Sequence, residues 1–465
     1  MFEKIVSTVN DIVWSPALVI LLIAAGLYFT VRTRFVQIRR LKLMVKLLFS
    51  RSPKAKGVSS FQAFCMALSG RVGTGNIVGV ATAIAMGGPG AIFWMWVIAF
   101  FGASTAFVES TLAQIYKFPH HTGWRGGPTT YIDNGLRQRW LGIIFALFTI
   151  IGYGLLSVTV QANGAASAAF NSFHLPPLAG GILLAALLLL VVAGGVKRIA
   201  NVAAVITPIM AVIYILFSLI IVALNYKAIP GMFSLIFTSA FGTNAAFGGI
   251  LGSAIAFGVK RGLYSNEAGQ GGGAIASASA DVSHPAKQGL VQAFSVYIDT
   301  LLVCTATALM ILSSGTYNVF DAAGGTVMSG APELGNNYVG FTQAAVDKVF
   351  HGFGGAFVSI ALFFFVFTTI IAYYFYAESS IAYLCSTGGK HRWKLEKVVV
   401  WIYRLLIAAA VVFGAVREAN VIWQLGDIGV GLTTWINVIV ILILCPQAIR
   451  ALKDLEKKEK AGELE

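Results

Sequence analysis

The residues best suited to chemistry lie in a glycine-rich run at the centre of a long apolar stretch, residues 61–86. The run reads Gly-Arg-Val-Gly-Thr-Gly-Asn over residues 70–76, and each glycine costs a helix about 1 kcal/mol relative to alanine. In hydrocarbon an unpaired peptide group costs several kcal/mol, so a break here needs protein, ligand or ion to satisfy the freed N–H and C=O groups. The sequence therefore predicts a membrane helix whose interruption forms a binding site.

Single polar side chains interrupt three other apolar stretches. Gln161 lies in YGLLSVTVQANGAASAAF, Asp299 in VYIDTLLVC and Glu109 in AFVESTLAQIY. Because polar groups are costly in lipid, we expect these side chains to face the interior of a helix bundle. Gln161 either holds a ligand or ties two helices together. Asp299 and Glu109 either relay a proton or cation or join helices.

The composition is that of a membrane protein with many spans. Of 465 residues, 57% are apolar and 11% charged, and the mean hydropathy is +0.80, whereas soluble domains carry about 25% charged residues. The net charge of +14 lies in loops between apolar stretches, which indicates topology and argues against nucleic acid as a partner. The four cysteines form no CxxC pair, so they predict neither a metal site nor disulfides.

Eleven apolar stretches are long enough to cross a bilayer, so we predict an all-α polytopic membrane protein with eleven transmembrane helices. They cover about residues 14–31, 61–86, 90–116, 141–170, 178–196, 202–224, 241–262, 288–313, 354–384, 398–415 and 420–447.

Basic residues follow every second stretch, beginning with the loop of residues 32–56, which has no acidic residue. Lys260 and Arg261 are assigned to another of these basic loops. By the positive-inside rule the basic loops are cytoplasmic, so we expect the N-terminus outside and the C-terminus in the cytoplasm. The predicted location is the plasma (inner) membrane, with lipid as the surroundings.

A second interrupted span is predicted at residues 241–262, because glycines interrupt this stretch at Gly242, Gly248, Gly249, Gly252 and Gly258. It is the sixth span counted from the first broken one. Two interrupted spans that open successive sets of five helices are typical of inverted-repeat secondary transporters, which hold substrate at mid-membrane between the broken helices. The predicted domains are an N-terminal helix with its basic loop, two five-helix repeats of opposite orientation and a charged tail, at residues 1–57, 58–226, 227–448 and 449–465.

These residues resemble the alanine or glycine:cation symporter family. The motif GGPGAIFWMW at residues 87–96, followed by Gly102, matches the family signature. The GTGNIVGVATAI run from Gly73, the KRGLYSNEAGQG run from Lys260 and the Asp299-Thr300 pair agree with it. The resemblance implies one N-terminal helix plus the five-plus-five inverted repeat of the bacterial leucine transporter. It also implies uptake of a small neutral amino acid, alanine or glycine first, driven by a cation.

A zwitterionic amino acid needs donors for its carboxylate, acceptors for its ammonium group and a pocket that limits side-chain size. Half-helix N-termini favour anions and C-terminal carbonyls favour cations. The expected substrate residues are Arg71, Gly73, Thr74, Gly75, Asn76, Gln161, Gly252, Ser253, Phe257, Gly258 and Tyr373. Alternatively, the glycines only let helices pack closely. As the family is understood, tryptophan often stands where this chain has Tyr373, a departure that would change the pocket volume.

The cation site is expected by analogy with the common sodium site of the fold. Counting along the sequence places the carbonyls at Ser69, Val72 and Phe365 and the hydroxyls at Thr368 and Thr369. Small hard cations prefer such oxygen ligands. The alternative is that adjacent threonines bond back to carbonyls one turn earlier. Sodium is therefore the expected coupling ion, and no cofactor is predicted.

Arg71 stands in the centre of the first break, where it costs roughly 3 kcal/mol or more unless it is paired or hydrated. Three roles stay open. Arg71 binds the substrate carboxylate, pairs with Asp299, or takes the place that a cation fills elsewhere, which would make transport independent of sodium.

Other functions are less consistent with these patterns. Both breaks lie in one chain, which favours a transporter over an ion channel assembled from several subunits. The chain has no HExxH, GxSxG or phosphate-loop motif, which argues against an enzyme. The alternatives that stay open are proton-coupled or sodium-independent transport, with serine or glutamine as substrate. Glu267 is interpreted as a cytoplasmic gate or a helix cap, and no oligomeric state is predicted.

Overall fold

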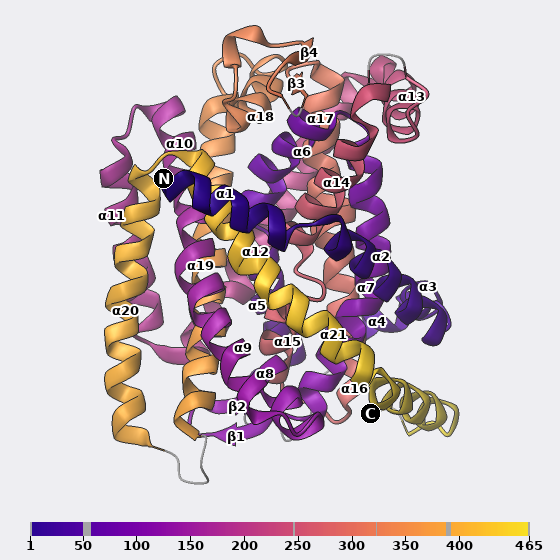
Figure 1. The fold of residues 1–465 in the computed structure, drawn as a ribbon, viewed down its shortest axis with the longest axis vertical. Helices are drawn as coiled ribbons and strands as arrows, with labels where there is room; N and C mark the ends of the chain where they lie inside the picture. The colour runs from indigo at the N-terminus through magenta and orange to yellow at the C-terminus, as the bar shows by residue number, and fades with distance from the viewer. Residues whose placement is uncertain (1, 50–56, 245–246, 322, 387–391, 464–465) are drawn as a thin grey trace.

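The computed structural model describes residues 2–49, 57–244, 247–321, 323–386 and 392–463. This part of the chain folds into a helical bundle with two short antiparallel hairpins, β1–β2 and β3–β4 (Figure 1). The strands are β1 (Phe118–His120), β2 (Gly123–Arg125), β3 (Asn318–Phe320) and β4 (Thr326–Ser329). The α-helices are α1 (Phe2–Val13), α2 (Pro16–Arg32), α3 (Val36–Arg39), α4 (Leu41–Leu48), α5 (Ser60–Arg71), α6 (Val80–Gly87), α7 (Ala91–Ile115), α8 (Pro128–Thr130), α9 (Arg139–Ile151), α10 (Val158–Phe173), α11 (Pro177–Val192), α12 (Gly195–Leu224), α13 (Ile229–Ala240), α14 (Leu251–Asn266), α15 (Gly272–Ala278), α16 (Pro285–Val296), α17 (Thr305–Ser314), α18 (Tyr338–Asp347), α19 (Gly354–Ser386), α20 (Trp393–Val416) and α21 (Ala419–Lys460).

Several long helices change pitch within their length. Wider π-helical turns, at Gly75–Gly79, Gly152–Ser157 and Tyr297–Cys304, join α6, α10 and α17 to the segments that precede them. Such turns often mark functional sites, because they interrupt the regular i to i−4 ladder. Two of the three contain or adjoin residues that the sequence singled out, namely Asn76 and Asp299.

Eight helices in the described part are long and apolar enough to cross a membrane: Glu3–Arg32, Ala91–Ile115, Arg139–Phe173, Gly195–Leu224, Pro285–Ser314, Gly354–Ser386, Trp393–Val416 and Ala419–Lys460. Shorter apolar helices cover Gly75–Gly87 and Pro177–Val192. The chain is thus a multi-pass helical membrane protein. The count of eleven spans stays a prediction.

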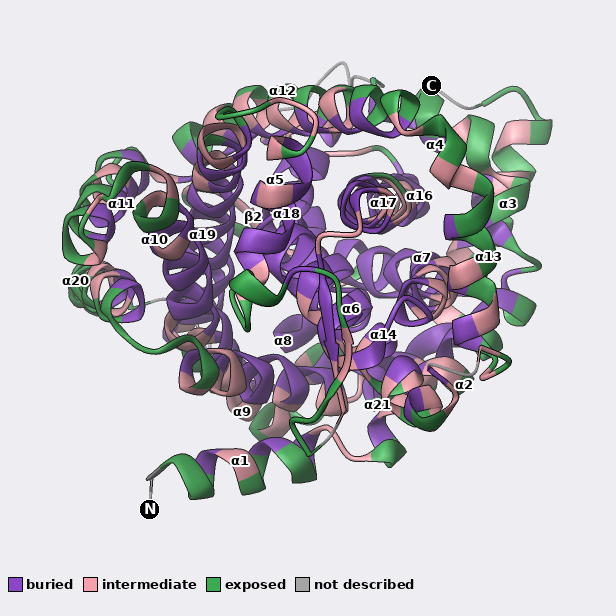
Figure 2. Ribbon diagram, turned by 90° about the horizontal axis from the view of Figure 1, so that it is seen from above, coloured by how far each residue is buried: buried purple, intermediate pink, exposed green. Residues whose placement is uncertain are grey.

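The buried elements lie at the centre of the bundle, as the view along its long axis shows (Figure 2). There α5 and α6 stand near the middle, and α2, α11, α12 and α20 form the perimeter. Large apolar side chains of the perimeter are exposed, among them Leu216 and Leu219 of α12 and Leu405 of α20. Apolar side chains exposed at the perimeter of the bundle suit contact with lipid hydrocarbon.

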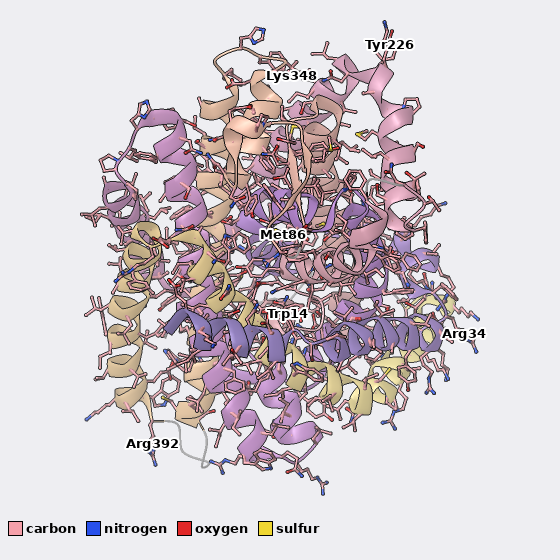
Figure 3. All side chains as sticks on the ribbon, turned by 45° about the horizontal axis from the view of Figure 1, so that its top comes forward. Trp14, Arg34, Met86, Tyr226, Lys348 and Arg392 are labelled. Atoms are coloured by element: carbon pink, nitrogen blue, oxygen red, sulfur yellow. The ribbon has the colours of Figure 1, made fainter. Side chains whose placement is uncertain are left out.

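The two ends of the bundle carry different connections (Figure 1). The β3–β4 hairpin, α13 and α18 lie at one end, and the β1–β2 hairpin lies at the other. The labelled side chains of Tyr226 and Lys348 mark the first end and Arg392 the second, while Trp14 and Met86 lie between them (Figure 3).

The first predicted interruption is confirmed. Helix α5 begins with a capping box between Ser59 and Gln62 and ends at Arg71. Val72 is extended, with φ −81° and ψ 94°, and the chain becomes helical again at the π-helical turn of Gly75–Gly79. The break therefore lies within the glycine run.

The second interruption lies further along the chain than predicted. The described residues before Leu251 form the connection from α13 to α14, and α14 is then continuous over Leu251–Asn266, so the prediction of an interrupted membrane helix at residues 241–262 is wrong. The chain leaves the helix at Glu267 (φ 54°), turns through Gly269 (φ 89°) and Gly271 (φ 95°), and resumes as α15. Left-handed φ values come at little cost to glycine, which explains why the NEAGQGG segment contains the break.

The charged residues of α14 also differ from expectation. Lys260 and Arg261 lie inside α14 and not in a basic loop between spans, because Asp427 of α21 compensates their charge within the bundle. Helix α21 continues without a break to Lys460, so residues 449–460 extend the last helix. Part of the predicted basic loop, residues 50–56, lies outside the described residues.

Candidate functional site

Four oxygen atoms gather where α5 ends beside α19. The Thr369 hydroxyl lies 2.8 Å from the Ser69 carbonyl, 3.0 Å from the Val72 carbonyl and 2.8 Å from the Phe365 carbonyl. All of these residues are buried. A hydroxyl has one proton to donate, so it can satisfy only one of the three carbonyls at a time. The Phe365 carbonyl lies inside the continuous helix α19 and also accepts a backbone N–H there, whereas the Ser69 and Val72 carbonyls of the break share the one hydroxyl proton.

Thr368 adds a fifth oxygen to this group. Its hydroxyl lies 3.0 Å from the Phe365 carbonyl, which Thr369 also contacts, and 3.1 Å from the Phe364 carbonyl of its own helix. Both threonines therefore bond back along α19, as the alternative interpretation stated. Thr369 alone of the pair also reaches the carbonyls of the first break. The structure brings together all five residues predicted for the cation site.

The N–H groups of the first break face side-chain oxygens. The Gly73 N–H donates to Asn76 Oδ1 at 2.8 Å, and the Thr74 N–H donates to Gln161 Oε1 at 2.8 Å. A Cβ atom at Gly73 would lie 2.6 Å from both Gln161 Oε1 and Thr369 Oγ1. Glycine is therefore required at this position by close approach, and it separates the amide-lined and hydroxyl-lined sides of the break.

Asn76 also connects the first break to Asp299. The Asn76 amide donates to Asp299 Oδ1 at 2.6 Å, and the Ser265 and Thr300 hydroxyls donate to Asp299 Oδ2 at 2.8 Å and 2.7 Å. Asp299 is fully buried. Three hydrogen bonds thus occupy both oxygens of the carboxyl group. This network joins the first break to α14 and to the π-helical turn before α17.

The second break is tied to the scaffold helices by Glu109 and Asn437. Glu109 Oε2 accepts the Gly269 N–H at 3.2 Å and the Asn437 amide at 3.0 Å. The Asn437 amide also donates to the Gly269 carbonyl at 2.9 Å. Glu109 belongs to α7 and Asn437 to α21, so these two helices hold the turn. This contact gives Glu109 a positional role, and a relay role stays a prediction.

Glu267 opens the second break and is a helix cap, one of the two predicted roles. Its N–H donates to the Leu263 carbonyl and so ends α14. Its buried carboxylate accepts a hydrogen bond from the Tyr376 hydroxyl at 3.3 Å. The gate role stays a prediction.

Tyrosine rings pack between α19 and the π-helical turn that precedes α10. The Tyr153 ring lies 5.1 Å from Tyr373 and 5.4 Å from Tyr376, both edge-on. The Tyr153 hydroxyl donates to Gln270 Oε1 at 2.9 Å. Tyr373 is buried in this cluster, so the structure places it beside the second break.

Arg71 points toward α16. Its guanidinium donates to the Gln292 carbonyl at 3.2 Å and to the Ser295 hydroxyl. Among the described residues no ion pair within 4 Å joins Arg71 to Asp299, whose oxygens are occupied by Asn76, Ser265 and Thr300. The guanidinium thus contacts a different helix from the one that carries Thr369.

The four residues predicted from α14 lie away from both breaks. Gly252 is exposed, and a Cβ atom there would meet nothing within 4 Å. Ser253 is partly buried, and the Gly258 backbone packs against Trp94, where a Cβ atom would lie 2.5 Å from that of the tryptophan. Gly258 therefore serves helix packing, the alternative stated for these glycines. Phe257 lines a cavity formed in part by α6, α14 and α21.

This cavity measures about 490 Å³ and contains a charge cluster that the sequence analysis missed. Asp427 Oδ2 lies 2.8 Å from Lys260 Nζ and 2.6 Å from Arg261 Nη2. The Arg261 guanidinium also lies 4.8 Å from the centre of the Trp423 ring. The available signal was Asp427 itself, a single carboxylate in the last apolar stretch, where such residues are functional candidates.

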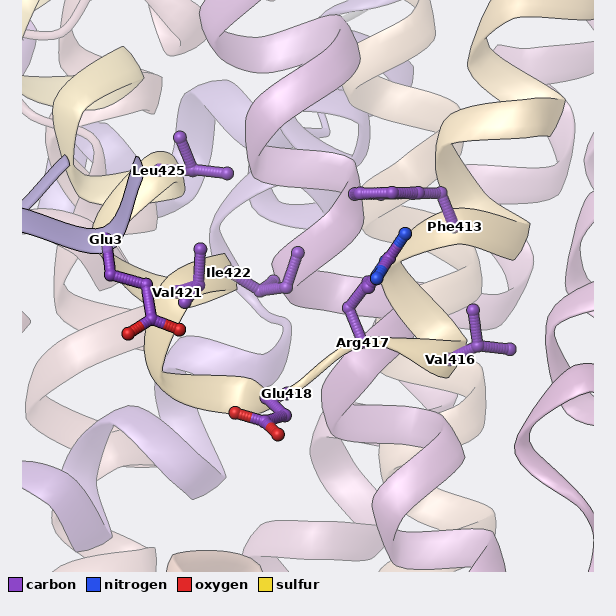
Figure 4. Close-up of a pocket in the computed structure, with 8 residues that line it drawn as sticks. All are labelled: Glu3, Phe413, Val416, Arg417, Glu418, Val421, Ile422 and Leu425. Carbon is purple, nitrogen blue, oxygen red and sulfur yellow. The ribbon is translucent and has the colours of Figure 1, made fainter. Parts of the chain in front are cut away.

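A second cavity, of about 550 Å³, lies between α1 and the turn from α20 to α21 (Figure 4). Its lining residues are Glu3, Phe413, Val416, Arg417, Glu418, Val421, Ile422 and Leu425. None of the residues predicted for substrate or ion binding lines it. We therefore place the candidate site at the two breaks.

Comparison with known proteins identifies a family. The model of the sodium:alanine symporter family matches residues 1–465. The chain is 47% identical, over 90% of its length and 93% of the other, to the sodium/proton-dependent alanine carrier protein of Bacillus sp. strain PS3. It is 41% identical, over 99% of its length and 92% of the other, to a protein of Bacillus subtilis strain 168 named as a probable sodium/glutamine symporter.

The fold also has a solved counterpart. The crystal structure of MhsT in complex with L-phenylalanine matches 85% of this chain and 98% of its own, with a TM-score of 0.56 and 14% sequence identity. At this identity the likeness concerns the fold alone, and that fold is the leucine-transporter type.

Proposed function

The chain belongs to the sodium:alanine symporter family, and from this we propose that it imports alanine or glycine together with sodium by alternating access. Cation-coupled amino-acid transport follows from the family. The choice of alanine or glycine, and of sodium, is the proposal. It rests on the named carriers among the relatives and on the geometry of the first break.

The observation that carries the proposal is the oxygen cluster around Thr369. Three carbonyls lie within 3.0 Å of one hydroxyl that can satisfy only one of them. Converging acceptors repel one another unless a positive charge lies among them. Unwound carbonyls at a broken helix are the usual ligands of a coupling sodium ion. We assign sodium to Ser69, Val72, Phe365, Thr368 and Thr369.

The substrate is assigned to the other side of Gly73. The N–H groups of Gly73 and Thr74 point to amide oxygens of Asn76 and Gln161, and a carboxylate is a stronger acceptor than an amide. In the proposal, the substrate carboxylate accepts from these N–H groups at the N-terminus of the half-helix that follows the break, where the helix dipole favours anions. Tyr373 and its neighbours limit the side chain to a small one.

The cavity at Asp427 is assigned to the outer side. The predicted positive-inside orientation places the end with β3–β4 outside and the end with β1–β2 in the cytoplasm. Asp427 of α21 then forms ion pairs with Lys260 and Arg261 of α14 on the outer side of the candidate site. We propose that these ion pairs close and open as the bundle that contains both broken helices moves against the scaffold.

Glutamine and a coupled proton form a second version of the proposal. One relative is named as a probable glutamine symporter, and another as sodium/proton-dependent. The buried carboxylates of Glu109 and Glu267 at the second break are the residues that could bind a proton.

Uptake by the purified protein in liposomes tests these versions. The experiment measures entry of labelled alanine, glycine, serine and glutamine under an inward sodium gradient, an inward proton gradient, or neither. The proposal expects saturable alanine or glycine uptake that requires the sodium gradient. Uptake that is equal with and without sodium would contradict the assignment of the Thr369 cluster, whereas sodium-driven uptake of glutamine alone would correct only the substrate.

A further inference from the structure

A cluster of metal-ligand side chains lies at the end of the bundle opposite α18, far from both breaks. His120 and His121 end the first strand of the β1–β2 hairpin and begin its turn, and Glu396 lies in the first turn of α20. One ligand atom from each of the three lies within 4.8 Å of the other two. We propose that these residues bind a transition-metal ion of the zinc class, which fastens the hairpin to α20.

The distances suit coordination of one ion. His120 Nε2 lies 3.2 Å from Glu396 Oε1. Nitrogen and oxygen ligands at about 2.0 to 2.1 Å from a tetrahedral zinc ion lie roughly 3.4 Å from each other. The pair therefore needs little movement to share an ion, and His121 lies close enough to provide the third ligand.

The hairpin turn fixes the orientation of the His120 ring. His120 Nδ1 lies 2.9 Å from Thr122 Oγ1 and 3.3 Å from Thr122 N. The Thr122 N–H donates to Nδ1 and so holds the ring with Nε2 toward Glu396. When a metal ion binds at Nε2, the imidazole proton moves to Nδ1, which then donates to the Thr122 hydroxyl. A metal-bound histidine usually has such a partner on its other nitrogen, because the bond fixes the tautomer and the ring direction.

Burial differs across the cluster in a way that allows an ion to enter. The side chains of His120 and Glu396 are 1% and 6% exposed, whereas His121 is exposed. His121, Thr122 and Glu396 line a cavity of about 160 Å³. The exposed imidazole and the cavity provide access, and water in the cavity can complete the coordination, as in other sites with three protein ligands.

The donor set selects the class of ion. Two imidazoles and one carboxylate suit zinc, copper, nickel or cobalt, whereas magnesium and calcium prefer oxygen ligands alone. The ion would bridge the connection between α7 and α9 to the start of α20. These elements are distant in sequence, so the ion would add a cross-link at this end of the bundle.

Cobalt titration of the full-length protein, with any polyhistidine tag removed, tests the site. Cobalt bound by two imidazoles and a carboxylate gives a visible absorption band, and added zinc should remove it by displacement. We expect one equivalent to bind the unaltered protein. The variants His121→Ala and Glu396→Gln should each weaken binding by at least about tenfold.

Two histidine variants serve as controls. His284 pairs with Asp454 at 3.1 Å elsewhere on the protein, and His174 is an exposed residue that follows α10. His284→Ala and His174→Ala should bind cobalt as the unaltered protein does. Because His121 is exposed, His121→Ala should also keep the melting temperature of the metal-free protein. Cobalt binding that survives His121→Ala, or that is absent from the unaltered protein, would overturn the proposal.

Discussion

The two interruptions differ in how their backbone groups find partners. At the first break the Ser69 and Val72 carbonyls both face the single hydroxyl of Thr369, which can donate to only one of them at a time. At the second break the Gly269 N–H donates to Glu109, and the Gly269 carbonyl accepts from Asn437, so donor and acceptor each have a partner. On the proposed function a cation completes the first break, whereas the peptide groups of Gly269 at the second break have their partners within the protein.

This difference assigns separate tasks to the two breaks. A break that the protein itself satisfies can transmit movement, because its contacts with α7 and α21 persist. A break with excess acceptors gains stability when a cation binds, and so couples ion binding to the position of the helix. On the proposed function, substitutions at the first break should therefore change the sodium dependence of transport far more than substitutions at the second break.

The largest expected effect comes from Gly73→Ala. The added methyl would lie 2.6 Å from both Gln161 Oε1 and Thr369 Oγ1, so it would displace the amide and the hydroxyl together. Misplacement of reacting or binding groups by about 1 Å can cost about 100-fold. We expect alanine uptake to fall by at least that factor, with normal expression and melting temperature. Uptake within threefold of the unaltered protein would remove the first break from the site.

Thr369→Val should have the next largest effect. The substitution keeps the shape of the side chain and removes the hydroxyl that contacts the three carbonyls. We expect the sodium concentration for half-maximal uptake to rise by at least about tenfold. Thr369→Ser restores the hydroxyl and should return this concentration to within threefold. A sodium dependence that is equal in the valine and serine variants would contradict the cation assignment.

At the second break, two substitutions of Glu109 distinguish position from charge. Both hydrogen bonds reach the same oxygen, Oε2, so Glu109→Gln can keep them through its amide oxygen. Glu109→Leu leaves the buried Gly269 N–H without this acceptor, which costs about 1 to 3 kcal/mol. We expect the glutamine variant to keep uptake within threefold, and the leucine variant to lose roughly tenfold and to melt at a lower temperature. If Glu109 relays a proton, both variants should lose proton-driven uptake equally.

The contrast also explains what the sequence could predict. The first break was predictable because three glycines and Asn76 interrupt an apolar run, and glycine is costly there in any lipid-facing helix. The gathering of Ser69, Val72 and Phe365 at Thr369 followed only from resemblance to a known fold. The residues come from helices about 300 positions apart, and no local pattern joins them.

The position of the second break was not predictable by the same rule. Glycine counts favoured residues 241–262, but Gly258 there serves close packing on Trp94. The true break depends on left-handed backbone at Glu267, and on Glu109 and Asn437 in two other helices. Likewise, the sequence predicts Lys260 and Arg261 in a loop, because their partner Asp427 is far away in the chain. In each case the deciding partner lies far away in the sequence.

The smallest expected effect, Gly252→Ala, decides between the two placements of the second break. In the structure Gly252 is an exposed residue of α14 whose added methyl would meet nothing within 4 Å, and alanine favours a helix over glycine by about 1 kcal/mol. Uptake should therefore stay within twofold and the melting temperature should not fall. If Gly252 instead belonged to an unwound substrate site, alanine would rewind it, and uptake would fall as steeply as in Gly73→Ala. The ratio of uptake by the two variants thus shows whether the functional break includes Gly252.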